Sequence, residues 1–140
     1  LNKQLKPLER YLSPSDFGFH NIILESNSKI RFIDFEYAGW DDPAKMVCDF
    51  FCQNSIPVSM EHYEMFTKGI VKGLKDSDRE LKRFEILLPV YQIKWCCIIL
   101  NDFMPIAVQR RKFANYTIDQ NKQKKKQLEK VRKSLNNVYV

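Results

Sequence analysis

The stretch that decides the fold is SPSDFGFHN at residues 13–21, followed by IDFE at residues 33–36. Between them lie two short runs of β-forming residues, 20–25 and 30–34, which the polar residues SNSK separate. Two such runs around a short polar turn predict an antiparallel β-hairpin. The hairpin would bring the two quoted stretches to the same end of its strands.

Three side chains in these stretches carry oxygen atoms that suit a metal site. Asp16 and Asn21 are five residues apart, with Gly18 as a permissive joint between them. The predicted hairpin would place Asn21 beside Asp34. Mg²⁺ prefers oxygen ligands at about 2.1 Å. The spacing therefore favours a shared metal between Asn21 and Asp34, with Asp16 aimed at the same place.

The same order of residues is used in phosphoryl transfer by kinases. There an aspartate accepts the proton of the attacking hydroxyl, and an asparagine five positions later and a second aspartate bind Mg²⁺. We therefore predict Asp16 as a catalytic residue and Asn21 and Asp34 as Mg²⁺ ligands. A lone aspartate in a loop is usually a turn or cap residue, so the prediction depends on the three residues together.

Length and composition predict one domain with a sizeable core, because the chain has 140 residues of which 44% are hydrophobic. The chain begins with Leu1, and the predicted catalytic loop follows within twenty residues, so we expect a fragment of a longer protein. The longest apolar stretch, 86–100, contains Pro89 and Lys94 and is shorter than a membrane span. No membrane partner is expected.

The four cysteines, at positions 48, 52, 96 and 97, lie in apolar helical patterns without CxxC or Cys/His ligand spacing. We expect reduced core thiols and a cytoplasmic location. After the hairpin the apolar residues recur with helical periodicity. We therefore expect an α+β fold that is mostly α. The first expected helix begins at Pro43 after an Asp41 or Asp42 cap. The other four cover residues 59–73, 79–102, 104–113 and 119–136. The third should be the buried centre of a bundle, kinked or divided by Pro89.

These motifs in this order resemble the C-terminal lobe of the aminoglycoside phosphotransferase and choline kinase superfamily, which has a protein-kinase-like fold. The run IDFEYAG at residues 33–39 is the specific part, since the choline kinase branch carries a similar Asp-Phe-Glu-Tyr run. Pro14 and Ser15 stand where the superfamily usually has His-Gly. The resemblance is sharp over about residues 10–55.

The resemblance implies an ATP-dependent transfer of a phosphoryl group to a hydroxyl of a small molecule, such as an aminoglycoside, a choline-like amino alcohol or a sugar. Residues 1–140 would be the C-terminal lobe, requiring Mg²⁺, ATP and an N-terminal lobe of the same protein. The four glycines form no Gly-rich phosphate cover. The fragment alone is expected to be inactive.

Ile23 and Ile33 resemble the apolar floor beneath adenine in kinases, but both residues also suit an ordinary strand core. Glu36 could reach a metal-bound water or the substrate, or form a salt bridge at the hairpin end. His20 could support the loop or meet a phosphate, although a structural histidine is the simpler interpretation. Asp49 is expected to brace the catalytic loop rather than react.

Aromatic and acidic residues after the metal loop are candidates for an acceptor pocket, because a cationic acceptor is attracted to carboxylates and aromatic faces. They are Tyr37, Trp40, Asp41 and Asp42, with Tyr91 and Trp95 as further candidates for the same wall. Each of these residues could instead belong to the core or cap a helix.

The net charge of +6 is uneven, since residues 110–140 hold ten of the 23 basic residues and two of the 17 acidic ones. The run NKQKKK at residues 121–126 could contact nucleic-acid phosphates. A solvated helix face is the preferred interpretation, because the segment keeps an apolar stripe and lacks interleaved aromatics. The alternative to an enzyme is therefore a non-catalytic kinase-like module whose basic C-terminal helix binds an acidic partner.

Overall fold

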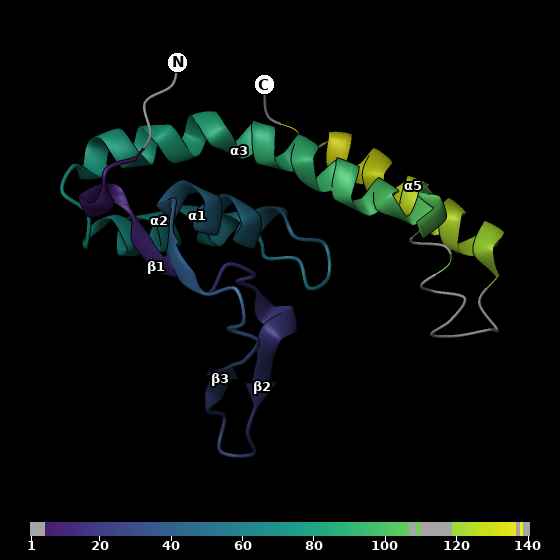
Figure 1. Cartoon of the computed structure of the whole chain (residues 1–140), viewed down its shortest axis with the longest axis horizontal. Coiled ribbons are helices and arrows are strands. Elements are labelled where there is room, and N and C mark those ends of the chain that lie inside the picture. The colour runs from purple at the N-terminus through teal and green to yellow at the C-terminus, as the bar shows by residue number, and fades with distance from the viewer. Residues whose placement is uncertain (1–4, 107–108, 110–118, 137, 139–140) are drawn as a thin grey trace. The chain divides into compact units, whose positions relative to one another are not determined.

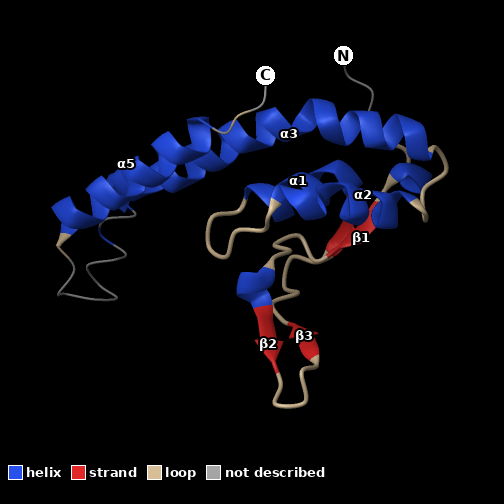
Figure 2. Cartoon of the chain, turned by 180° about the vertical axis from the view of Figure 1, so that it is seen from behind, coloured by secondary structure: helices blue, strands red, loops and turns tan. Residues whose placement is uncertain are grey.

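The computed structural model describes residues 5–106, 109, 119–136 and 138. The chain divides into two compact units, residues 1–91 and residues 92–140, which are described separately. Helices dominate and two small antiparallel sheets accompany them, which confirms the predicted α+β, mostly α class (Figure 2). The helix predicted over 104–113 lies largely outside the described residues.

The strands are β1 Tyr11–Ser13, β2 Ile22–Leu24, β3 Ile30–Phe32 and β4 Gly39–Asp41. The α-helices are α1 Pro43–Cys52, α2 Tyr63–Val71, α3 Ser77–Leu100 and α5 Gln120–Asn136. Short 3-10 helices occupy Pro7–Glu9, Phe19–Asn21, Met60–His62 and Asn101–Phe103. The predicted hairpin is confirmed as β2 and β3, which pair Ile22 with Phe32 and Leu24 with Ile30 (Figure 1). Its strands are shorter than predicted.

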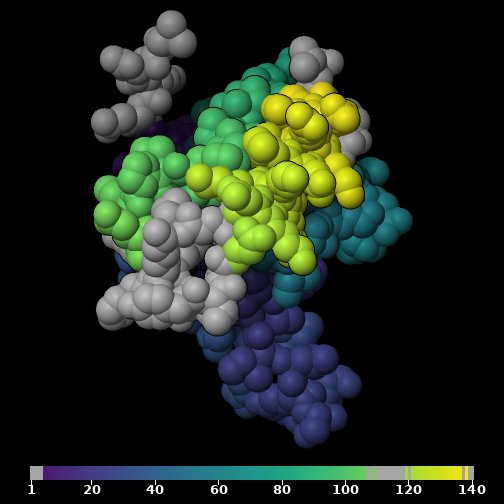
Figure 3. Space-filling model, turned by 90° about the vertical axis from the view of Figure 1, so that its right-hand side faces the viewer, coloured from purple at the N-terminus to yellow at the C-terminus, as the bar shows by residue number. Residues whose placement is uncertain are grey.

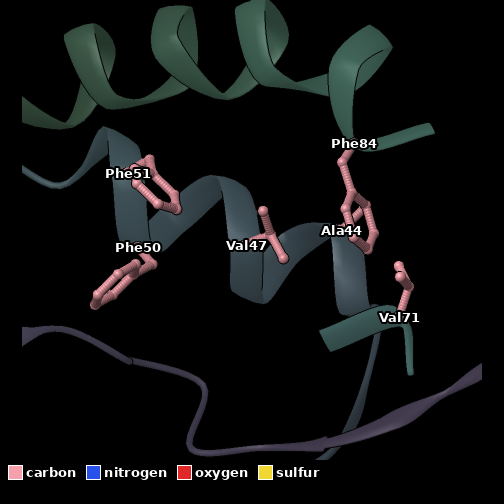
Figure 4. Close-up of a cluster of buried hydrophobic side chains, with 6 residues drawn as sticks. All are labelled: Ala44, Val47, Phe50, Phe51, Val71 and Phe84. Carbon is pink, nitrogen blue, oxygen red and sulfur yellow. The ribbon is translucent and has the colours of Figure 1, made fainter. Parts of the chain in front are cut away.

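The core of the first unit is built around α1. Asp42 caps this helix by accepting a hydrogen bond from the backbone N–H of Ala44 at 2.8 Å, and Pro43 occupies its first turn, as predicted. Figure 4 shows the buried side chains that meet there, which are Ala44, Val47, Phe50 and Phe51 of α1, Val71 of α2 and Phe84 of α3. Ser59 begins the 3-10 turn that leads into α2.

α3 differs from its prediction in its burial. Of the two effects predicted for Pro89, a division of the helix does not occur, because α3 continues through this residue as one helix. Its expected burial is wrong at several apolar positions, because Ile86, Val90 and Ile93 are 62%, 57% and 51% exposed. By length and composition alone, the segment Ser77–Phe103 could cross a membrane, unlike the shorter stretch considered from the sequence. Core helices of soluble proteins share this property, so it does not place the chain in a membrane.

The second unit has a small core of its own. Cys96 and Ile99 of α3 and Val131 of α5 are buried together, with Leu100 beside them. α5 begins after Asp119, whose carboxylate accepts hydrogen bonds from the N–H groups of the first turn. All four cysteines are free, as predicted, but Cys97 is exposed and is not a core thiol.

Candidate active site

Two nested strand pairs connect the two quoted stretches near their ends. The inner pair joins Ile22, directly after the first loop, to Phe32, directly before the second. The outer pair joins Ser13, the first residue of the first stretch, to Gly39, three residues beyond the end of the second. Both ends of both loops are therefore fixed by antiparallel ladders. The outer pair, β1 with β4, was not predicted from the sequence.

Asn21 connects the three predicted site residues. Its side-chain Nδ2 donates a hydrogen bond to the backbone carbonyl of Asp16 at 2.9 Å. Its own backbone carbonyl accepts a hydrogen bond from the N–H of Ile33 at 3.0 Å, which places Asp34 one residue beyond this contact. The structure thus brings Asp16, Asn21 and the start of the Asp34 loop together.

The side-chain oxygens left by these contacts suit a hard cation. Because Nδ2 of Asn21 is engaged by Asp16, the amide oxygen Oδ1 is the atom that remains for a ligand. The Asp34 carboxylate adds a second oxygen donor, and amide and carboxylate oxygens are what Mg²⁺ prefers. Within the described ranges, no three His, Cys, Asp or Glu residues form a metal-binding group. The predicted ligands, the Asn21 amide oxygen and the Asp34 carboxylate, fit Mg²⁺ by their donor chemistry.

Two positive backbone φ angles lie next to these groups. Ser15, directly before Asp16, has φ 70°, and Asp34 has φ 65°. Non-glycine residues rarely occupy this left-handed region, although aspartate tolerates it better than most. Such conformations persist where surrounding contacts hold them, and they concentrate at functional sites. Both loops therefore turn sharply beside the predicted reactive side chains.

Lys45 of α1 makes a contact that holds Ser15 in place, and a role for this lysine was not predicted from the sequence. Its Nζ donates to the backbone carbonyl of Ser15 at 3.2 Å and pairs with Asp41 at 3.0 Å and with Asp49 at 3.6 Å. Asp49 is only 7% exposed. Asp49 is thus linked to the carbonyl of Ser15 through Lys45, and its bracing of the loop stays a prediction. The signal in the sequence was an aspartate four residues before and four after this lysine. Asp49 lies one turn further along the same face of α1, whereas Asp41 ends β4 just before the helix.

Phe17 anchors the first loop on the hydrophobic core. Its ring centroid lies 5.0 Å from that of Phe50 in α1 and 5.0 Å from that of Phe32 in β3. The loop therefore rests on both the helix and the hairpin. Since Phe17 directly follows Asp16, this packing limits the movement of the catalytic candidate.

His20 lies against the carboxylate of Asp16. Its Nε2 is 3.2 Å from Asp16 Oδ1, and its Nδ1 is buried with no hydrogen-bond partner in the described part of the chain. The ring occupies the space beside Gly18, where an added Cβ would lie 2.6 Å from Cε1 and Nδ1 of the histidine. The contact with Asp16 therefore favours support of the loop over phosphate binding as the role of His20.

The candidates for nucleotide and acceptor contact are exposed. Ile23 is 51% and Ile33 43% exposed, so neither is strand core. Tyr37 and Trp40 are 73% and 69% exposed, which excludes a core role for them in this unit. Glu36 is exposed as well, and among residues 5–106 it has no ion-pair partner.

Two further candidates of the acceptor wall lie on α3. Tyr91 is half-buried, and burial together with the nearby Asp49 and Asp42 raises the pKa of its phenol. Trp95 falls in the second compact unit, so its place relative to the loops is not defined. Asp41 and Asp42 are engaged with Lys45 and with the α1 N-terminus, respectively.

Comparison with known proteins identifies no relative of this chain. No family model, no curated protein and no solved structure matches the sequence.

Proposed function

We propose that this chain is the C-terminal lobe of an ATP- and Mg²⁺-dependent phosphotransferase in the cytoplasm. The acceptor is a hydroxyl of a small molecule of the amino alcohol, sugar or aminoglycoside type. The fold assignment to the protein-kinase-like class is part of this proposal. It rests on the motif order in the sequence and on the loop contacts described above.

The observation that carries the proposal is the double contact of Asn21. One contact ties its side chain to Asp16, and the other ties its backbone to Ile33, next to Asp34. A turn or cap function for each residue separately would not require these links. Two oxygen ligands and one carboxylate base on fixed loops are the minimum that phosphoryl transfer needs from this side of the substrate.

Each residue then has a defined task. Asp16 orients the acceptor hydroxyl and takes its proton late in the reaction, so its position matters more than its basicity. Asn21 Oδ1 and the Asp34 carboxylate would hold Mg²⁺, which when bound offsets negative charge on the phosphoryl oxygens. His20 and Lys45 keep the loop in place through their contacts with the Asp16 carboxylate and the Ser15 carbonyl, respectively.

Exposed apolar residues in the hairpin and directly after it support the proposed nucleotide site. Ile23, Ile33 and Phe35 are each about half exposed, and such side chains are normally covered in a complete binding site. We assign Ile23 and Ile33 to the floor of the nucleotide site. The phosphate cover and its lysine would come from an N-terminal lobe outside these residues.

The test is acceptor-stimulated release of ADP by the protein carrying its N-terminal lobe. Candidate acceptors are amino alcohols, sugars and aminoglycosides. Asp16→Asn should lower the rate by about 100-fold or more with little change in nucleotide affinity, because it removes a proton acceptor. Asp78→Asn, an exposed acid at the start of α3, is the matched control and should leave the rate unchanged. Equal rates in wild type and Asp16→Asn would instead favour a non-catalytic module.

A further inference from the structure

The outward side of α5 combines positive charge with exposed leucines. The helix carries seven lysines and arginines and one glutamate. Its inner side is fixed within the second unit, where Val131 packs against Cys96 and Ile99 and Gln127 donates to Asp102 at 2.6 Å. The opposite side is exposed along the length of the helix.

Two rows of residues make up this exposed side. The first row is Lys125, Leu128, Arg132 and Leu135, whose spacing of three and four residues aligns them along the helix. Leu128 is 41% and Leu135 48% exposed. The second row is Lys122, Lys126, Glu129 and Lys133, all exposed. These eight residues form the basic face of α5, and the helix is drawn yellow-green to yellow in Figure 3.

We propose that the basic face of α5 binds the surface of an anionic phospholipid membrane, with the helix lying parallel to it. Five lysines and arginines against one glutamate complement a layer of acidic headgroups. Leu128 and Leu135 would enter the boundary with the acyl chains. Lys125 and Arg132, in the same row, can lay their aliphatic stems beside the leucines while their charges remain at the headgroups.

The leucines favour a membrane over a nucleic acid. A phosphate backbone is bound through charge and hydrogen bonds and offers no apolar layer to Leu128 and Leu135. The face also holds four lysines and one arginine, whereas base recognition relies strongly on arginine. No membrane partner was expected from the sequence, because its longest apolar stretch is too short to span a membrane. A helix that lies on the surface needs no span, so this proposal replaces that expectation.

The experiment is co-sedimentation of the 140-residue chain with vesicles of phosphatidylcholine, with and without phosphatidylserine. Lys125→Glu with Lys126→Glu tests the charge, and Lys72→Glu with Lys75→Glu is the matched control on exposed lysines of the first unit. Leu128→Asn with Leu135→Asn tests the apolar contact, and Ile56→Asn with Met65→Asn is its control, since Ile56 and Met65 are also exposed. Circular dichroism verifies that each variant keeps its helices.

Wild type and both controls should bind only the vesicles that contain phosphatidylserine. The lysine variant and the leucine variant should each bind about tenfold more weakly or worse. The leucine variant should still be retained on heparin like wild type. Binding equal to wild type by the leucine variant would overturn the proposal and assign the face to a soluble polyanion. Absence of binding to acidic vesicles, or equal binding to neutral ones, would overturn it as well. None of these outcomes bears on the phosphotransferase proposal.

Discussion

The side-chain amide of Asn21 donates to the backbone carbonyl of Asp16, with 2.9 Å between nitrogen and oxygen. One residue therefore closes the loop that contains Asp16, and its amide oxygen Oδ1 is left as the atom that could bind a ligand. This relationship links the stability of the loop to its ability to bind a metal, and the two properties can be separated by substitution.

Asn21→Ala should lower the free energy of unfolding by about 1 kcal/mol, because it removes one side-chain hydrogen bond. It should also weaken binding of Mn²⁺, used as a spectroscopic substitute for Mg²⁺. The matched control is Asn27→Ala, which removes the hydrogen bond from Lys29 N–H to Asn27 Oδ1 in the hairpin turn. Urea unfolding and Mn²⁺ titration should show a similar stability loss in the control with unchanged metal binding. Equal metal affinity in both variants would contradict the ligand role.

Gly18→Ala should displace His20, because the new Cβ would lie 2.6 Å from the imidazole ring. We expect a loss of about 1 to 3 kcal/mol in unfolding free energy, which is typical of a forced side-chain shift. Gly39→Ala is the control, since no atom lies within 4 Å of its Cβ position. Adding His20→Ala to Gly18→Ala should recover much of the loss. If the double variant were as unstable as the sum of both single ones, the ring would not be the obstacle.

Lys45→Met should destabilise the chain by about 1 to 2 kcal/mol, because Ser15 and the buried Asp49 both lose a charged partner. Lys68→Met removes an exposed i,i+4 pair with Glu64 and should change stability by less than about 0.5 kcal/mol. Chemical denaturation measures both. The amide of Asp16 should also exchange faster with solvent in Lys45→Met alone. Unchanged exchange at Asp16 would show that Lys45 supports only α1.

Tyr63 should make the chain sensitive to alkaline pH. Its hydroxyl is buried without a hydrogen-bond partner in the described ranges, and burial, with nearby Cys48 and Glu85, raises the pKa of the phenol. In the unfolded chain tyrosine ionises near pH 10, so stability present below this pH is lost as pH rises above it. Tyr63→Phe should weaken that loss and be neutral or stabilising by up to about 1 kcal/mol at pH 7.

Tyr37→Phe is the control for this measurement, since Tyr37 is 73% exposed. Urea unfolding at pH 7 and above pH 10 compares the two variants with wild type. A loss of several kcal/mol in Tyr63→Phe at pH 7 would mean that the hydroxyl makes a stabilising contact.

Local patterns predicted the β2–β3 hairpin well. Residues 22–24 and 30–32 are short runs of β-forming residues on either side of a short polar turn, so pairing requires only local chain reversal. The cap at Asp42 and the proline after it likewise act within one turn of α1. These features depend on residues that are close in sequence, so local sequence patterns are enough to predict them.

The remaining features depend on distant contacts. β1 pairs Tyr11 with Asp41, thirty positions further along the chain, and each strand has three residues, too few for a period to emerge. Lys45 reaches Ser15 across a similar separation. The apolar periodicity of α3 indicates a helix but not which of its faces has a partner, and Ile86 and Val90 are exposed. Burial of a whole helix cannot be inferred from its apolar content alone.

The most direct test of the central claim is paramagnetic broadening of amide NMR signals by Mn²⁺ in the presence of ATP. The proposal predicts that signals of residues 15–21 and 33–36 broaden first, and that Asn21→Ala combined with Asp34→Asn removes this selectivity. Asp76→Asn with Asp78→Asn, on acids away from the loops, should leave it intact. Broadening centred on other acidic residues, or unaffected by the loop substitutions, would contradict a shared metal site at Asn21 and Asp34.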